Sequence, residues 1–372
     1  MDSDDNDLIR RLREAPATPP APGGATSPAP ASAPVPYRTD EAGPARPAAN
    51  ATFVVHDDWG PPPAPPSSEE LAAIAATERL RAVGRLALFA LAVGMGLAGI
   101  WVAWMHLVSD PLAEARVYYD AATRLNLGHA LYPAGANPAI AGIYRDPPLL
   151  AMVLRPLALL PYQAFALAWE LLVVASFGLL VRQLGARSER TWVAIGLLGI
   201  PIGWALSIAQ AQVPLTLLVA IGQPWSVALA ANVTLFPGLI VLWWIGRRDW
   251  QATFAFIAWM ILLGGAQWIL DGTASTAFLR TLAPGDYGDI RSLSPYAISP
   301  AAWAVLVGAG VFATLLLART RWGWTAAVAL STLAPPRLLG YALMTLAAIV
   351  RTPRVGDPEE PTVRPISPWR SG

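Results

Sequence analysis

The hydrophobic pattern divides the chain near residue 68. The stretch from Ala15 to Pro66 contains no long apolar run and is dominated by proline and alanine, whereas apolar runs follow one another from there to about residue 350. A segment without apolar runs cannot bury enough surface to offset the entropy lost on ordering. We therefore predict a disordered Pro/Ala-rich tail over 1–68, a membrane domain over 69–350 and a cytoplasmic C-terminal tail over 351–372.

The first long apolar run follows an amphipathic segment. Residues 67–84 begin with Ser67 and place Glu69 and Glu70 in the first turn, as is typical of a helix N-terminus. The run from Arg85 to Val108 has no charged side chain after the arginine. At ~1.5 Å per residue it extends ~36 Å, enough to cross a ~30 Å hydrocarbon core with some tilt. We predict an amphipathic helix that leads into a membrane span.

Further apolar segments continue the pattern, and several of them are too short to span alone. They cover about 148–160, 161–182, 190–208, 211–222, 225–245, 251–270, 300–318, 323–333 and 337–350. Basic residues favour cytoplasmic loops, so five arginine clusters set the orientation: Arg79/Arg81/Arg85, Arg182/Arg187/Arg190, Arg247/Arg248, Arg319/Arg321 and Arg351/Arg354. Both termini are then cytoplasmic, and the loops 109–147 and 271–299 lie outside.

This orientation constrains the short segments. It makes 148–160 an interfacial helix and 161–182 the span. It also predicts a hairpin at 225–245, broken near Phe236-Pro237-Gly238, and a turn at Pro335-Pro336. The predicted fold class is all-α, a polytopic transmembrane bundle of about ten membrane helices. If 225–245 is instead one full span, Arg247 and Arg248 lie outside.

Composition supports a membrane protein. The chain is 55% hydrophobic and 14% charged, and its mean hydropathy is +0.44, values that exclude a single soluble enzyme. A net charge of +1 gives no strong attraction for nucleic acid. The chain has no cysteine, and its three histidines share no metal-ligand spacing. We therefore predict no metal site and no cofactor.

The densest group of ionisable residues lies in the first outer loop. Asp110, Glu114 and Asp120 stand beside Arg116 and Arg124, and residues 110–127 have helical spacing. A carboxylate at the membrane boundary suits deprotonation of an acceptor hydroxyl while a lipid-linked donor presents its reactive carbon from the bilayer. Neighbouring arginines would hold a leaving phosphate. The alternative is that Asp110 caps the loop helix and the other charges pair on a solvated surface.

Three other polar residues leave further alternatives open. Glu170, within 161–182, either faces the bundle interior or is a hydrogen-bonded structural residue. Gln210 and Gln212 either line the same cavity as the outer loop or satisfy a helix terminus. Short broken helices and Glu170 also fit a secondary transporter or flippase, although no inverted repeat is evident.

An ordered series of blocks resembles glycosyltransferase family 87, the polytopic polyprenyl-phosphate-mannose-dependent mannosyltransferases of the GT-C superfamily that act in envelope glycolipid synthesis. The resemblance covers about 85–350. It is carried by Asp110–Pro133, Tyr144–Pro161 with Trp169-Glu170, Gln210–Leu218, Ala228–Trp250, Ser294–Trp303 and Arg319–Ile349.

The resemblance implies a GT-C fold in the plasma membrane with its active site on the outer face. It implies inverting transfer of a hexose, mannose, from a polyprenyl-phosphate donor to a lipid or glycan acceptor. An outer-loop Asp acts as general base in that family; Asp110 is the matching candidate, and Glu114, three residues before Val117, is the second. Residues predicted to bind substrates are Arg116, Tyr118, Tyr119, Asp120, Arg124, Tyr144, Arg145, Gln210, Gln212 and Arg337.

Three positions depart from the family pattern. Asp146 stands where an aromatic residue usually precedes Pro-Pro, and Thr234 stands where a lysine often precedes Leu-Phe-Pro. The Gln-x-Asn pattern appears here as Gln210-Ala211-Gln212. Compared with the family pattern, this chain lacks a lysine that would bind phosphate and has an additional carboxylate. A catalytically degenerate member, or an assembly partner acting through the tail, is therefore a further alternative.

Overall fold

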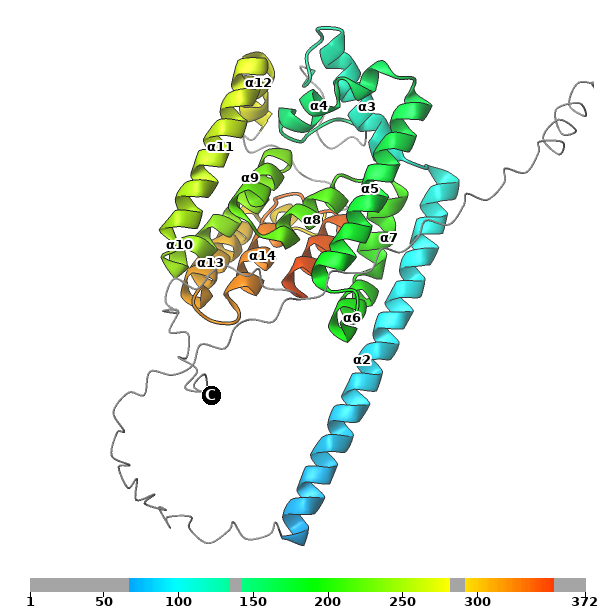
Figure 1. The fold of residues 1–372 in the computed structure, drawn as a ribbon, viewed down its shortest axis with the longest axis vertical. Coiled ribbons are helices and arrows are strands. Elements are labelled where there is room, and N and C mark those ends of the chain that lie inside the picture. Colours follow the sequence, from blue (N-terminus) through cyan, green and yellow to red (C-terminus); the bar gives the residue numbers. More distant parts are fainter. Residues whose placement is uncertain (1–66, 134–141, 282–291, 351–372) are drawn as a thin grey trace, which may run out of the picture. The chain divides into compact units, whose positions relative to one another are not determined.

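The computed structural model describes residues 67–133, 142–281 and 292–350. Within these ranges the chain forms helices and no strand, which confirms the all-α prediction (Figure 1). Apart from Ser67 and Ser68, the two predicted tails lie outside the described residues.

The first element, α2 (Ser68–Ser109), is one continuous helix of 42 residues. Ser67 caps it: the Glu70 amide donates to the Ser67 hydroxyl over 3.2 Å, and the Ser67 amide donates to the Glu70 carboxylate over 2.7 Å. The predicted amphipathic helix and the predicted span are therefore parts of the same helix. Its ~63 Å length exceeds what a ~30 Å hydrocarbon core requires.

The remaining elements alternate between long helices and short ones. In chain order they are α3 (Ala113–Asn126), α4 (Pro148–Leu154), η1 (Leu157–Leu159), α5 (Tyr162–Leu184), α6 (Glu189–Leu197), α7 (Gly199–Ser207), α8 (Gln212–Ile221), α9 (Pro224–Val233), η2 (Phe236–Ile240), α10 (Val241–Arg247), α11 (Trp250–Leu270), α12 (Gly272–Thr281), η3 (Pro295–Ala297), α13 (Pro300–Leu317), α14 (Gly323–Leu333) and η4 (Gly340–Val350).

Four helices of the described chain are long and apolar enough to cross a membrane: α2, α5, α11 and α13. The pair α6 and α7, bent by 69° at Leu198, would make a fifth. The chain is therefore a polytopic membrane protein, while the predicted count of about ten membrane helices stays a prediction. The predicted break at Phe236-Pro237-Gly238 is confirmed, because η2 separates α9 from α10 there.

One predicted helix begins later than expected. Asp110 is the C-cap of α2, and α3 starts at Ala113 after a residue, Leu112, with a φ of 56°. Pro111 has no amide hydrogen to continue the α2 ladder, and the left-handed backbone of Leu112 turns the chain. The predicted helix over 110–127 is thus wrong at its start, and Asp110 and Glu114 do not share a helix.

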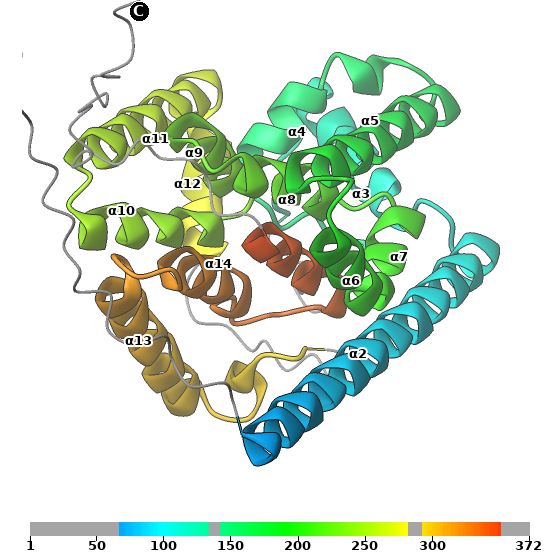
Figure 2. The ribbon, with the colours of Figure 1, turned by 60° about the horizontal axis from the view of Figure 1, so that its bottom comes forward.

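Close helix packing joins α2 to α6 and α7 (Figure 2). Gly99 is buried at this contact, where an added Cβ would overlap the carbonyl group of Gly199. An added Cβ on Gly196 would lie 2.6 Å from the Ala92 carbonyl oxygen. Small residues let the backbones of neighbouring membrane helices approach closely, so these glycines set the distance from α2 to α6 and α7.

Gly99→Ala is expected to lower stability by about 1–3 kcal/mol, because the new methyl group forces two packed backbones apart. Gly94→Ala is the matched control: it lies on the same helix and an added Cβ meets no atom within 4 Å. The control should be neutral or stabilising by up to about 1 kcal/mol. Unfolding by denaturant in detergent, followed by tryptophan fluorescence, measures both. Equal stability of the two variants would contradict the packing argument.

A tryptophan cluster forms the core on the other side of the bundle. Trp243 of α10 and Trp324 of α14 pack edge to face with ring centres 5.0 Å apart, and both are almost completely buried. The Trp324 indole donates to the carbonyl oxygen of Ala348 over 2.8 Å. This bond fixes η4 against α14 and so positions the segment that precedes η4.

Candidate active site

Helix α3 is anchored through its backbone to the turn between α7 and α8. The Leu112 amide donates to the Ser207 carbonyl oxygen over 3.3 Å, and the Glu114 amide donates to that of Ile208 over 3.1 Å. Leu112 and Ala209 both have positive φ, at 56° and 57°, which costs a non-glycine residue about 1–2 kcal/mol. Strained residues of this kind cluster at functional sites.

A second contact holds the same turn. The buried indole of Trp169, on α5, donates to the Ala209 carbonyl oxygen over 2.8 Å. The strained turn is therefore tied to α3 on one side and to α5 on the other. This double attachment fixes the first turn of α3, which carries Glu114.

Glu114 occupies an electrostatic environment unlike that of an exposed carboxylate. Burial raises its pKa to about 7, the positive charge of Arg337 opposes that rise, and the carboxylate of Asp110 adds to it. Arg337 is half-buried in the segment between α14 and η4. A carboxyl group whose pKa lies near neutrality can both lose and accept a proton there, as a general base must.

A second carboxyl group belongs to the same cluster. Burial raises the pKa of Asp146 to about 7, and the charge of Glu114 adds to the rise. Asp146 precedes α4, and its backbone oxygen accepts a 2.6 Å hydrogen bond from the Tyr132 hydroxyl. The sequence identified Asp146 only as a departure from a family pattern and did not place it in the site. The available signal was an acidic residue directly before Pro147-Pro148.

Tyr118 and Gln210 connect three elements around these carboxyls. The buried Tyr118 hydroxyl of α3 donates to the Gln210 side-chain oxygen and accepts the Ala211 amide over 3.2 Å. Gln210 also hydrogen-bonds Tyr341 of η4. Tyr341 carries no sequence signal beyond its position in an apolar run. The predicted residues Tyr118, Gln210 and Arg337 therefore lie together with Glu114.

Buried amides fix the loop that carries Asp146. Gln267 of α11 donates to the Asn232 side-chain oxygen, and its own oxygen accepts the Leu149 amide over 3.1 Å. The predicted site residue Tyr144 donates to the Pro147 carbonyl oxygen over 2.7 Å and accepts the Ala151 amide over 3.2 Å. Buried polar groups satisfied in this way rigidify their surroundings.

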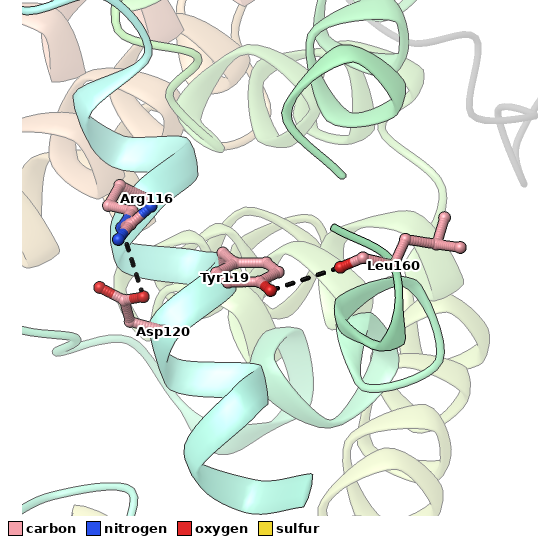
Figure 3. Close-up of polar contacts among 4 residues, drawn as sticks. All are labelled: Arg116, Tyr119, Asp120 and Leu160. Atoms are coloured by element: carbon pink, nitrogen blue, oxygen red, sulfur yellow. Dashed lines mark hydrogen bonds and ion pairs between the residues drawn. The ribbon is translucent and has the colours of Figure 1, made fainter. Parts of the chain in front are cut away.

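Other predicted site residues lie on the exposed side of α3. Arg116 pairs with Asp120 at 3.5 Å, and the Tyr119 hydroxyl donates to the Leu160 carbonyl oxygen over 3.3 Å (Figure 3). The Arg116 guanidinium also stacks over the Tyr162 ring, 4.6 Å from its centre. Arg124 is also exposed. The structure thus pairs Asp120 with Arg116 of the same helix.

The last three predicted site residues differ in their exposure and contacts. Asp110 is exposed at the end of α2 and acts on Glu114 through its charge. Gln212, at the start of α8, donates to the Thr345 hydroxyl of η4. Arg145 is half-buried beside Asp146. The structure thus separates a buried set around Glu114 from an exposed set around Arg116.

An apolar groove lies near the buried set. It has a volume of about 470 Å³ and runs between α13 and α14, where Trp303 and Leu330 line it. Leu293 and Leu338 line it as well, and the Leu293 amide donates to the Leu338 carbonyl oxygen over 2.7 Å. Leu338 directly follows Arg337 in the chain. The apolar groove therefore reaches the residue next to the arginine that faces Glu114.

Comparison with known proteins identifies two curated relatives. The chain is 27% identical over 290 residues to a polyprenol-phosphate-mannose-dependent alpha-(1-2)-phosphatidylinositol pentamannoside mannosyltransferase of Mycolicibacterium smegmatis, a match that covers 68% of each chain. It is 26% identical over 225 residues to a protein of the same description from Mycobacterium tuberculosis, covering 54% of this chain and 51% of that relative. No protein-family model matches the chain. No solved structure matches it significantly.

Proposed function

We propose that the chain is a membrane mannosyltransferase that moves mannose from polyprenyl-phosphate-mannose to a hydroxyl of a lipid or glycan acceptor. The observation that carries this proposal is the succession of three features: an apolar groove that Leu338 helps to line, the cation of the preceding residue, Arg337, and the carboxyl of Glu114, on which that cation acts. The donor has the same order of parts, an apolar chain, a phosphate and a sugar. The two curated relatives bear the name of this donor.

Glu114 is the general base of the proposed reaction. Its carboxylate takes the proton of the acceptor hydroxyl as that oxygen attacks the anomeric carbon of mannose. The bond between that carbon and the phosphate oxygen breaks, and polyprenyl phosphate leaves with the bonding electrons. Arg337 stabilises the charge on the leaving phosphate. Attack opposite the leaving group inverts the configuration at the anomeric carbon.

The proposed site lies on the outer face of the membrane. Helix α5 is a single span of 23 residues that begins at Tyr162, against Arg116 of α3, and carries Arg182 in its last turn. Arg187 and Arg190 follow directly. Because basic clusters mark cytoplasmic ends, the α3 end of this span faces outward. A lipid-linked acceptor and a lipid-linked donor would both reach the site from the outer leaflet.

A secondary transporter or flippase is the second candidate, favoured by Glu170. This carboxylate lies inside the α5 span, and its Oε2 atom is buried without a hydrogen-bond partner among the described residues. Carboxylates of that kind mark ion pathways in transporters. The half-buried carboxyl groups of Glu114 and Asp146, however, lie outside the candidate spans and fit acid–base chemistry at the membrane boundary better than transport through its midplane.

The direct test uses the purified protein in lipid nanodiscs with polyprenyl-phosphate-mannose, radiolabelled in the sugar, and a phosphatidylinositol mannoside acceptor. We expect label to move to the acceptor and free polyprenyl phosphate to accumulate. A radiolabelled nucleotide sugar is the control donor and should give no product. Movement of intact donor across a proteoliposome bilayer, without loss of its sugar, would instead establish the transporter.

A further inference from the structure

The segment that carries Arg337 has no secondary structure of its own to hold it. Residues 335–339 form neither helix nor strand, and the two prolines among them have no amide hydrogen to donate. Contacts with the segment before η3 hold it on one side: the Leu338 amide donates to the Ser292 hydroxyl over 3.2 Å. The place of Arg337 therefore also depends on where the following residues, at the start of η4, are seated.

The start of η4 is seated on a tryptophan of α7. A Cβ added at Gly340 would lie only 3.0 Å from the ring carbon Cζ3 of Trp204, so the indole reaches the glycine backbone because no side chain is present there. The next ring, Tyr341, meets the same indole edge to face with ring centres 5.6 Å apart, and it also hydrogen-bonds Gln210. Trp204 is thus the surface on which the chain rests three residues after Arg337.

The Trp204 ring has little room to move away from Gly340. His106, in the last turn of α2, packs against it with ring centres 5.5 Å apart. The Nδ1 atom of His106 donates to the Val102 carbonyl oxygen over 2.9 Å, which fixes the histidine ring in turn. A side chain added at Gly340 would therefore displace η4 and the segment before it more readily than the indole.

The backbone of Trp204 reaches the other half of the site. Its carbonyl oxygen accepts the Ile208 amide over 3.3 Å, and the Ile208 carbonyl oxygen accepts the Glu114 amide over 3.1 Å. Two hydrogen bonds therefore join Trp204 to Glu114, while the Trp204 ring supports the segment of Arg337. One residue connects the proposed base to the cation proposed to bind phosphate.

We propose that Trp204 is a positioning residue for the transfer reaction, a spacer that sets the distance between Glu114 and Arg337. The inference rests on the proposed function. In that reaction the acceptor oxygen, held by the base, and the leaving phosphate, held by the cation, lie on opposite sides of the anomeric carbon of mannose. The spacing of the two protein groups must match that geometry for transfer to be fast.

A double-mutant cycle tests the spacer. Gly340→Ala adds a methyl group against the indole and should lower kcat/KM for the donor by about 3- to 30-fold, since a shift of a fraction of an ångström already costs rate. Trp204→Phe removes the ring carbon that meets Gly340 and should lower kcat/KM by a similar factor. The double variant should be more active than either single variant, because the methyl group fills the space that the smaller ring leaves.

Gly178→Ala on α5 is the matched control, because an added Cβ there meets no atom within 4 Å. Its kcat/KM should stay within about twofold of the wild type. Rates are expressed per folded protein, so a contact that serves stability alone would leave kcat/KM of Gly340→Ala unchanged and overturn the inference. Additive losses in the double variant would overturn it as well. Where Gly340→Ala yields no folded protein, a wild-type kcat/KM in Trp204→Phe overturns it and a loss supports it.

A second measurement needs no transfer activity. The chain has no cysteine, so Arg337→Cys introduces a unique thiol whose rate of modification by a methanethiosulfonate reagent, in nanodiscs, reports where the segment lies. Gly340→Ala in that background should change the rate, and added Trp204→Phe should bring it back; equal rates in all three proteins would overturn the spacer. A wild-type protein that transfers no mannose, with thiol rates that follow the cycle, would overturn the proposed function and leave the contact between Trp204 and the Arg337 segment in place.

Discussion

Glu114→Gln is expected to lower the turnover number by about 10²- to 10⁴-fold. Glutamine has the size of glutamate and keeps a hydrogen-bonding oxygen, but it cannot accept the acceptor proton. Arg337, the cation that acts on Glu114, is only half-buried and can be hydrated, so loss of the Glu114 charge should leave the amount of folded protein nearly unchanged. Initial rates of mannose transfer in nanodiscs measure the loss, and elution on a sizing column verifies the fold.

Asp110→Asn tests the competing base. Asp110 is exposed at the end of α2, and asparagine terminates a helix about as well as aspartate. The Asp110 charge contributes to the raised pKa of Glu114. We therefore expect the turnover number of Asp110→Asn to stay within a few-fold of wild type, and the loss of activity on acidification to occur at slightly lower pH. A larger loss in Asp110→Asn than in Glu114→Gln would move the base to Asp110 and contradict the structural assignment.

The apolar periodicity was sufficient to predict where the long helices lie. Helices α5, α11 and α13 fall within a few residues of their predicted ranges because uninterrupted apolar runs specify them. The kink at Leu198 interrupts the segment predicted over 190–208, and its sequence signal is Pro201, which has no amide hydrogen to bond the Leu197 carbonyl oxygen. The bend also depends on the glycines that let α6 and α7 pack against α2, a tertiary contact that local sequence does not encode.

The site was predictable only in part, for a related reason. Glu114 could be selected as a carboxylate near a membrane boundary, but its difference from Asp110 depends on burial against the α7–α8 turn and on Arg337 from the end of the chain. The arginines nearest in sequence, Arg116 and Arg124, turned out to be exposed. Sequence proximity could not single out Arg337 as the cation that acts on Glu114, because α3 has two faces and only the buried one turns Tyr118 toward Gln210.

Arg337→Met is expected to lower kcat/KM for the donor by about 10²- to 10³-fold, the usual cost of removing a group that stabilises developing charge. Methionine keeps much of the side-chain length without the charge. A second effect follows from linkage to Glu114. The charge of Arg337 opposes the rise in the Glu114 pKa, so without that charge the pKa rises further. The loss of activity that accompanies protonation of Glu114 then occurs at higher pH than in the wild type. Raising the pH should therefore recover part of the activity.

Two further variants separate charge from geometry. Arg337→Lys keeps the positive charge, so activity should fall on acidification at nearly the same pH as in the wild type. The KM for the donor should rise, because lysine lacks the planar guanidinium that binds phosphate at two points. Arg116→Met removes the exposed arginine that pairs with Asp120, and activity should stay within about twofold, as for most exposed ion pairs. A loss in Arg116→Met that matches Arg337→Met would place the donor phosphate on the outer face of α3 and away from the groove between α13 and α14.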